Sequence, residues 1–216
     1  MKKKIFVLCL LVVVSAVLFC GCNTMKDETA ELLNSAKNAS YGKTTTTVKT
    51  QLDGQTLTSV FVAEKTDDKT AVVNYIIEQL SLFDENSTVA PSETTTYSGS
   101  FYVSGGKISN HTGDNMLPDI EGAYTVLLTN GITFNKDYFG KTEVTTQDGK
   151  TQIVAEVKNP SAFLAQSFSG RNMTATMVVS QNALVSLALD YVDSNGAVVN
   201  ITYEFTVEQS QQSVEA

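Results

Sequence analysis

The sequence predicts an α+β protein. Its main element is a long, coiled antiparallel sheet that forms a half-open barrel, with an N-terminal helix and one or two inserted helices on its concave face. Three observations predict this class. Apolar and polar residues alternate over most of the chain, Gly-containing turn pairs separate these runs, and a few short stretches carry helix signals instead. We expect roughly eight to ten strands, and a sheet of that length must coil.

The first element is a helix over residues 27–40, DETAELLNSAKNAS. Ala30, Leu33 and Ala36 recur at helical spacing in this stretch, and acidic residues occupy the first turn, where the helix dipole favours negative charge. One apolar face of the helix should therefore pack against the sheet.

A β-hairpin follows the helix. The Thr-rich runs 43–52 and 55–65 flank Asp53–Gly54, a pair that is typical of a tight hairpin turn. Threonines occupy every position of 44–47, which makes the first strand polar on both faces. We therefore expect this strand to lie near an edge of the sheet.

Residues 70–83 permit two interpretations. Val72, Ile76 and Leu80 would share one face of a helix. The segment is also rich in β-branched residues and follows a polar turn, both of which are typical of a strand. We favour the strand.

The middle of the chain combines hairpins with helices. A loop at 84–93 leads into a hairpin over 94–111, and a further hairpin turns at Asp148–Gly149. Residues 117–131 predict a helix, because their apolar side chains share one face and a proline stands in the first turn. A shorter helix is expected over 159–170, which starts with an Asn-Pro cap pair and should end at its final glycine.

The last third of the chain predicts a three-stranded meander with turns at Gln181–Asn182 and Asp193–Gly196. Apolar residues there alternate with Thr, Ser, Asn and Glu, so one face of each strand should point inward. The residues expected on the inward face are Met173, Ala175, Met177, Val179, Val185, Leu187, Leu189, Tyr191, Val199, Ile201, Tyr203, Phe205 and Val207.

The composition argues against several classes of function. The chain has 216 residues and a formal net charge of −8, which disfavours nucleic acid as a partner. His111 is the single histidine and no cysteine follows Cys22, so catalysis by a His-paired nucleophile is not expected. Asp190, Asp193 and Asn195 lack the closing Glu of an EF-hand, and a β-turn explains them better. We expect no metal, no cofactor and no enzymatic activity.

The N-terminus resembles the lipobox signal of bacterial lipoproteins. Lysines precede an uncharged apolar run at 5–19, and Gly21 stands directly before Cys22. The resemblance implies that Cys22 carries a diacylglyceryl group and anchors the protein at the extracytoplasmic face of the cell membrane. Cys20 is an alternative lipidation site, and an uncleaved membrane anchor is an alternative to the signal. The resulting division is a signal peptide at 1–21, a tether at 22–27, a single domain at 28–208 and a polar tail at 209–216.

Apolar side chains also gather on the two connections after the expected central helix. The candidate ligand-binding residues are Phe134, Phe139, Phe163, Phe168 and Met177, because Phe and Met make an adaptable apolar lining. Ordinary core packing is the alternative explanation of the same residues.

The order of elements, which ends in VVNITYEF, resembles the half-barrel of Lol-type lipoprotein carriers and of mycobacterial lipid-carrying lipoproteins. This resemblance covers most of residues 26–208 at the level of pattern. It implies an acyl chain or another apolar ligand between the sheet and the helices. Two functions therefore remain: a membrane-anchored lipoprotein that binds a lipid or other apolar ligand, or a non-catalytic interaction module that binds another component of the cell envelope.

Overall fold

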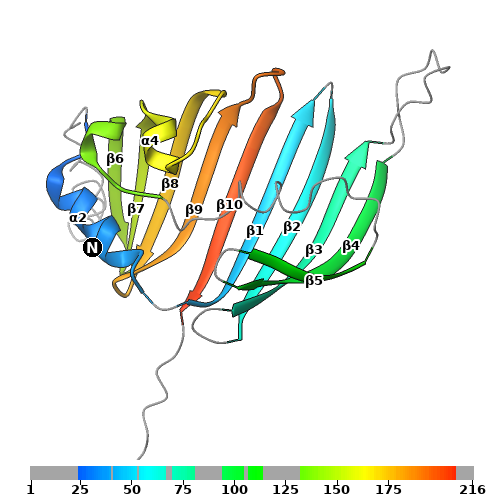
Figure 1. The fold of residues 1–216 in the computed structure, drawn as a ribbon. Helices are drawn as coiled ribbons and strands as arrows, with labels where there is room; N and C mark the ends of the chain where they lie inside the picture. Colours follow the sequence, from blue (N-terminus) through cyan, green and yellow to red (C-terminus); the bar gives the residue numbers. More distant parts are fainter. Residues whose placement is uncertain are drawn as a thin grey trace, which may run out of the picture.

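A single ten-stranded antiparallel sheet dominates the structure (Figure 1). The structure, a computed structural model, describes residues 24–39, 41–52, 54–66, 70–80, 94–104, 107–113 and 132–207. The strand order is β5-β4-β3-β2-β1-β10-β9-β8-β7-β6, so the closing strand β10 pairs with the opening strand β1 and joins the two halves of the chain.

The strands in chain order are β1 (Tyr41–Leu52), β2 (Gln55–Lys65), β3 (Thr70–Leu80), β4 (Thr94–Ser104), β5 (Lys107–Gly113), β6 (Phe139–Gln147), β7 (Lys150–Val157), β8 (Arg171–Ser180), β9 (Ala183–Val192) and β10 (Val198–Val207). The helical elements are α2 (Asp27–Ala36), the 3-10 turn η2 (Lys136–Tyr138) and α4 (Pro160–Leu164).

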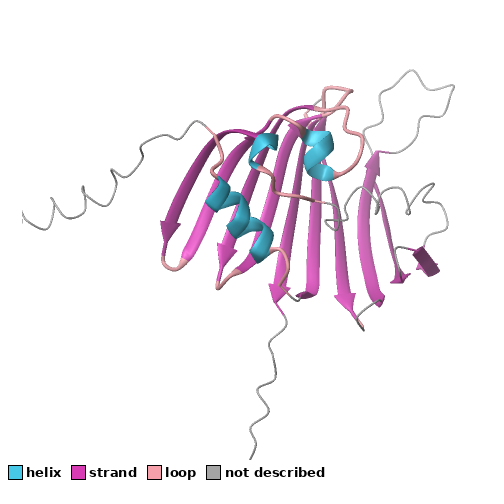
Figure 2. Ribbon diagram, turned by 60° about the vertical axis from the view of Figure 1, so that its left-hand side comes forward, coloured by secondary structure: helices cyan, strands magenta, loops and turns pink. Residues whose placement is uncertain are grey.

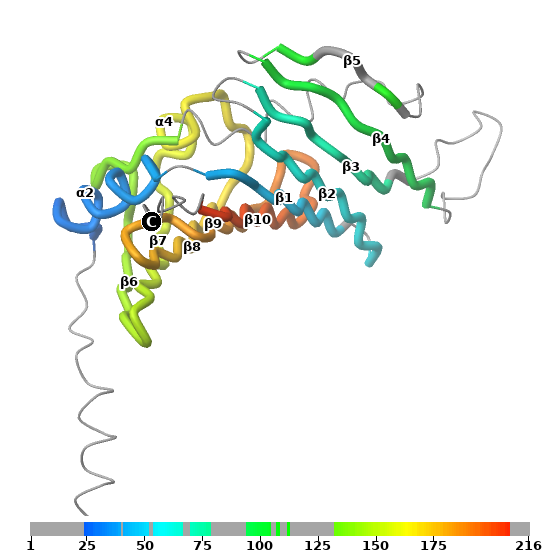
Figure 3. Tube along the Cα trace, turned by 90° about the horizontal axis from the view of Figure 1, so that it is seen from below, coloured from blue at the N-terminus to red at the C-terminus, as the bar shows by residue number. Residues whose placement is uncertain are grey.

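The sheet curves along its length from β6 at one end to β5 at the other (Figure 3). The helices α2 and α4 lie on the same, concave side of it (Figure 2). This arrangement confirms the expected fold class, a long coiled sheet in the form of a half-open barrel with helices on its concave face.

One register row crosses every strand and defines the inner face. Its members, in spatial order from β6 to β5, are Val144, Ile153, Met177, Leu187, Tyr203, Thr46, Phe61, Tyr75, Gly99 and Gly113. Because side chains alternate between the two faces of a strand, this row identifies the inner side of each strand. Most of its large side chains are buried, so the core is a layer that runs along the concave face.

Strand β1 lies in the middle of the sheet, and the expected edge position was wrong. It pairs with β10 on one side and β2 on the other, and Thr46 is buried between Tyr203 and Phe61. Threonine is β-branched, and its methyl group packs on a half-buried pleated surface. A strand that is polar on both faces can therefore lie in the middle of a sheet.

The ambiguous segment is a strand over Thr70–Leu80, as favoured from its composition. Val73, Tyr75 and Ile77 are buried, whereas the intervening Asn74 and Ile76 are exposed. The period of the segment is therefore two, and Val72 and Ile76 do not share a buried helix face.

The short helix α4 begins as predicted and ends earlier than predicted. The Asn159 side chain accepts a hydrogen bond from Ala162 N, and Pro160 occupies the first turn. The helix ends at Leu164 because Ala165 adopts a left-handed conformation with φ of 53°, so Gly170 is not its stop.

The closing meander confirms the predicted alternation with two corrections. A register shift between Val178 and Val179 places Leu184 in the core and leaves Val185 only half-buried. A bulge adds one residue to a strand and so reverses which side chains point inward. Farther along the meander, Phe205 is half-buried and Val207 is exposed, because the end of β10 passes beyond the densest packing.

Several expectations fall on residues that the structure does not describe. They are the signal peptide at 1–21 with Cys20 and Cys22, the loop at 84–93, the helix at 117–131 and the tail at 209–216. Met25 lies in the stretch expected to be a tether, and its side chain is buried, so packing of the chain begins before α2. No helix within the described ranges has the length and hydropathy needed to cross a membrane.

Candidate functional site

The segment 132–136 crosses the concave face beside α2, and we call it the strap. Side chains of α2 and of Lys37, the residue that follows it, hold the strap along its length. Asn34 Nδ2 donates to the carbonyl of Phe134 at 2.7 Å, and the amide of Phe134 donates back to Asn34 Oδ1 at 3.3 Å. Lys37 Nζ donates to the carbonyl of Ile132 at 2.8 Å. The strap therefore runs antiparallel to the helix and cannot leave it without breaking several bonds.

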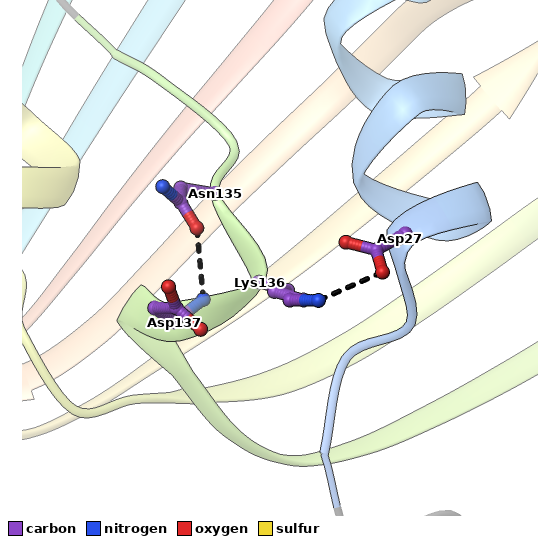
Figure 4. Close-up of polar contacts among 4 residues, drawn as sticks. All are labelled: Asp27, Asn135, Lys136 and Asp137. Carbon is purple, nitrogen blue, oxygen red and sulfur yellow. Dashed lines mark hydrogen bonds and ion pairs between the residues drawn. The ribbon is translucent and has the colours of Figure 1, made fainter.

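An ion pair closes the other end of this contact. Lys136 Nζ lies 2.7 Å from Asp27 Oδ2, while Asn135 Oδ1 accepts from the amide of Asp137 at 3.0 Å and caps η2 (Figure 4). The hydrogen bond and the charge of Asp27 raise the pKa of Lys136. Both side chains of the pair are exposed, so this contact orients the strap more than it stabilises the fold.

A pocket of about 640 Å³ lies between the strap, the end of α2 and the inner face of the sheet, and we call it the strap pocket. The described residues that line it are Lys37, Asn38, Ala39, Tyr41, Thr44, Lys65, Ile132, Phe134, Leu184, Leu187 and Phe205. They come from the turn after α2, from β1, β2, β9 and β10, and from the strap.

Aromatic rings form much of one wall of the strap pocket. The rings of Tyr41 and Phe205 lie 5.1 Å apart, and Phe205 stacks on Tyr203 at 6.3 Å with an interplanar angle of 5°. The Tyr41 hydroxyl donates to the carbonyl of Ala36 at 2.8 Å, which ties the wall to α2. Burial raises the pKa of Tyr41, and a hydrogen bond with the Leu184 backbone opposes that rise. This wall adds apolar contact area to a mixed lining that also contains Lys37, Asn38, Thr44 and Lys65.

The five residues predicted from the sequence as ligand-binding are brought together only in part. The Phe163 ring contacts those of Phe134 at 5.8 Å and Phe139 at 5.2 Å, and all three are buried. Phe168 packs instead on Tyr191 at 5.0 Å, and Met177 is buried in the central row of β8. Only Phe134 lines the strap pocket, so a ligand role for the other four stays a prediction.

The sequence reasoning did not single out most of the strap pocket. Leu187 and Phe205 were expected on the inner face, but alternation does not show which inward side chains border an open space. Leu184 was missed because the bulge near it changes the side on which it lies. Ile132 and Tyr41 sit in irregular or strand-end positions that carry no periodic signal.

A second hollow of about 600 Å³ lies beside the start of α2. It is lined by Thr24, Met25, Lys26, Asp27, Glu28, Lys136, Asp137, Phe139 and Lys158. Its mixed charges and single aromatic side chain make it a weaker candidate for an apolar ligand than the strap pocket.

The acidic residues that were tested against a calcium-binding pattern instead form hydrogen bonds within the closing meander. Asp193 Oδ1 accepts from the amides of Asn195 at 2.8 Å and Ala197 at 2.9 Å, which builds the turn between β9 and β10. Asp190 Oδ1 accepts from Asn200 Nδ2 at 2.7 Å across the same two strands. Within the described ranges, no three His, Cys, Asp or Glu side chains gather as a metal site would require. The backbone of His111 lies inside β5 and not at a hairpin end.

No protein-family model matches the chain, and no curated protein matches it either. Among solved structures, a LolA superfamily protein from Nitrosomonas europaea is similar at 9% identity and a TM-score of 0.33, over 86% of this chain and 95% of that one. A redesigned β-barrel is similar at 14% identity and a TM-score of 0.21, over 84% of this chain and 95% of that one. The dehydratase domain of the terminal module of the rifamycin polyketide synthase is similar at 12% identity and a TM-score of 0.21, over 85% of this chain and 82% of that one.

The resemblance to Lol-type carriers expected from the sequence thus has a counterpart among these structures. At such TM-scores the likeness carries no argument about function, so the functional case depends on the strap pocket.

Proposed function

We propose that this protein is a lipid-anchored, extracytoplasmic binding protein that holds a lipid or another apolar ligand in the strap pocket. The observation that carries the proposal is the pocket itself, which has a volume typical of small-molecule sites and a wall of aromatic and aliphatic side chains. The lipobox-like Gly21–Cys22 supports the anchor and the location.

The position of the pocket suits a binding protein. Its walls belong to the sheet, to the turn after α2 and to the strap, and hydrogen bonds from Asn34 and Lys37 hold the strap beside the helix. A pocket formed in advance avoids part of the cost of ordering side chains when a ligand binds.

Photo-crosslinking of the full-length protein in phosphatidylcholine nanodiscs tests the binding. A hexadecanol probe that carries a diazirine on its chain should label peptides containing Phe134, Leu187 or Phe205. Ala39→Phe places a ring in the pocket wall and should remove most of this labelling. Ser35→Phe adds the same ring to an exposed position of α2 and should leave it unchanged. Equal labelling of both variants, or labelling elsewhere only, would contradict a ligand in this pocket.

A separate substitution tests the anchor. Cys22→Ala should release the protein from the membrane fraction or leave the precursor uncut, because two acyl chains are needed for stable anchoring. A variant of mature mass that still sediments with membranes would contradict lipidation at Cys22, and Cys20→Ala serves as the comparison.

An interaction module is the second candidate, and the convex face of the sheet favours it. Ile76 is 53% exposed and Tyr102 is 42% exposed on neighbouring strands. Apolar side chains exposed on a sheet face can contribute to a contact surface with another protein. Ile76→Ser with Tyr102→Ser should then abolish co-purification of an envelope partner and leave probe labelling intact.

A further inference from the structure

The core of the domain begins very close to the expected lipidation site. Met25 follows Cys22 by three residues, its side chain is 3% exposed, and α2 begins at Asp27. An extended chain spans at most about 3.6 Å per residue, so Met25 lies within about 11 Å of Cys22. An acylated Cys22 would therefore hold the folded domain directly against the membrane, with no long linker between them.

The surface at this short connection is the hollow of about 600 Å³ beside the start of α2, which we call the N-terminal hollow. Its lining combines residues 24–28 with residues of η2, the first residue of β6 and the residue after β7. We propose that the N-terminal hollow rests on the bilayer that carries the anchor and takes the headgroups of zwitterionic phospholipids. This inference rests on the proposed lipid anchor, and it adds an orientation of the domain on the membrane.

The N-terminal hollow carries as many basic as acidic side chains, although the whole chain has 23 acidic and 15 basic residues. The lysines are Lys26, Lys136 and Lys158, and the acids are Asp27, Glu28 and Asp137. A zwitterionic headgroup presents a phosphate and an amine close together, so a lining of both signs is complementary to it. The acidic remainder of the chain disfavours an anionic membrane surface.

Two of the three lysines are available to phosphate. Lys136 Nζ is already engaged, because it lies 2.7 Å from Asp27 Oδ2 (Figure 4). The ion pairs among the described residues do not involve Lys26 or Lys158, and both of these residues are exposed. Lysine binds phosphate as a point charge and does not need a rigid arrangement of donors.

Weak contacts suffice here because the anchor supplies the proximity. An exposed ion pair contributes only about 0–1 kcal/mol, too little to hold a free domain on a membrane. A short linker makes the contact intramolecular, with an effective concentration on the order of millimolar. Contacts from Lys26 and Lys158 can therefore orient a tethered domain that they could not recruit.

The orientation also bears on the strap pocket. Asp27 and Glu28 in the first turn of α2 line the N-terminal hollow, whereas Lys37 and Asn38 after its last turn line the strap pocket. The ten residues of α2 span about 15 Å. Docking of the N-terminal hollow would thus keep the strap pocket about one helix length from the headgroups, so a lipid could reach it while the protein stays on the surface.

Tryptophan fluorescence tests the orientation, because the chain has no tryptophan of its own. Asp137→Trp places a probe in the N-terminal hollow, and Gln147→Trp places one at the other end of β6, about 26 Å away at 3.3 Å per residue. Both positions are exposed. The full-length, acylated protein is studied in phosphatidylcholine nanodiscs in which some headgroups carry a nitroxide, a short-range quencher. Asp137→Trp should lose most of its emission, and Gln147→Trp should keep most of it.

A longer linker separates headgroup contact from the anchor. Inserting about twenty Gly and Ser residues between Asn23 and Thr24 lowers the effective concentration, so contacts of the hollow must then hold the domain. In this form, Lys26→Gln combined with Lys158→Gln should reduce the quenching of the Asp137→Trp probe by about half, and higher salt should act in the same direction. Lys150→Gln removes an exposed charge at the far end of the same hairpin and should change nothing.

The outcomes separate this inference from the proposed anchor. Equal quenching of the two probes, or quenching of neither in a protein that stays in the nanodisc, would overturn docking through the N-terminal hollow and leave the anchor standing. Quenching that neither the two Gln substitutions nor salt reduces would overturn the binding of headgroups there. A protein that leaves the nanodisc and carries no acyl group on Cys22 would instead overturn the proposed anchor.

Discussion

The side-chain amide of Asn34 forms a two-way pair with the backbone of Phe134, although the two residues are 100 positions apart. Nδ2 donates to the Phe134 carbonyl at 2.7 Å, and the Phe134 amide donates to Oδ1 at 3.3 Å. Asn34 thus satisfies the backbone N–H and C=O of Phe134, a strap residue that is not part of a strand. Both hydrogen bonds are part-buried. The strap's irregular backbone is stable there because a helix side chain takes the place of a strand partner.

Asn34→Ala is therefore expected to lower the free energy of unfolding by about 1–2 kcal/mol, since it removes two part-buried hydrogen bonds. The strap should also loosen, so photolabelling in the strap pocket should fall. Urea unfolding and amide hydrogen exchange of Ile132 and Phe134 measure the two effects. Ser35→Ala, on the exposed side of the same helix, is the control and should change neither. An Asn34→Ala variant with unaltered exchange at Phe134 would show that the pair does not hold the strap.

Gly99 and Tyr75 form a second relationship that a substitution can test. They are paired across β4 and β3, and the Tyr75 ring lies over the glycine. A Cβ at position 99 would meet both the Tyr75 hydroxyl and the backbone carbonyl of Thr112 at distances that real Cβ atoms do not show. The carbonyl belongs to β5 and cannot move without disturbing the pairing of β4 with β5.

Gly99→Ala should accordingly lower the free energy of unfolding by about 1–3 kcal/mol, the range typical of overpacking. Hydrogen exchange should accelerate first in β5, because the backbone contact lies there. Ser98→Ala is the matched control, since Ser98 is exposed on the other face of the same strand. Unchanged stability and β5 exchange in the Gly99 variant would mean that this close approach is not maintained in solution.

The alternation of apolar and polar residues was sufficient to predict the inner face of most strands that have one buried face. Alternation placed Tyr203, Leu187 and Met177 on the inner face, and the register row confirms all three. It failed for β1, because position in a sheet depends on which strands pair, and Thr46 is accommodated in the centre by its neighbours. Local patterns specify the faces of a strand and not its place in the order.

The candidate site was less accessible from sequence than the fold. Phe134 was predicted from composition to bind a ligand, and it lines the strap pocket, but the pocket is also lined by Tyr41 and Lys65, which lie far from Phe134 in the sequence. A pocket forms where packing is incomplete between elements, and that depends on curvature and on a strap held by long-range hydrogen bonds. Hydrophobic periodicity predicts neither the curvature of the sheet nor the long-range hydrogen bonds of the strap.

Tyr203 supplies a pH-dependent prediction. Burial in the core raises its pKa above the ordinary value of 10, and the neighbouring Tyr191 adds to the rise. Below pH 10 the phenol is protonated in both states, so its contribution to stability is fully present. Above pH 10 the unfolded chain releases the proton while the folded protein keeps it, so the free energy of unfolding falls as pH rises. The slope from one such group is about 1.4 kcal/mol per pH unit.

Urea unfolding between pH 9 and pH 11.5 measures this slope. Tyr203→Phe removes the titrating group and should make the slope shallower by about 1 kcal/mol per pH unit, whatever it does to stability at pH 8. The slope of the variant should not fall to zero, because burial also raises the pKa values of Tyr41 and Tyr191. Tyr102→Phe, which removes a phenol whose ring is exposed on the convex face, serves as the comparison variant. Identical slopes for the unaltered protein and Tyr203→Phe would mean that Tyr203 releases its proton without unfolding, which is inconsistent with its place between Leu187 and Thr46 in the buried row.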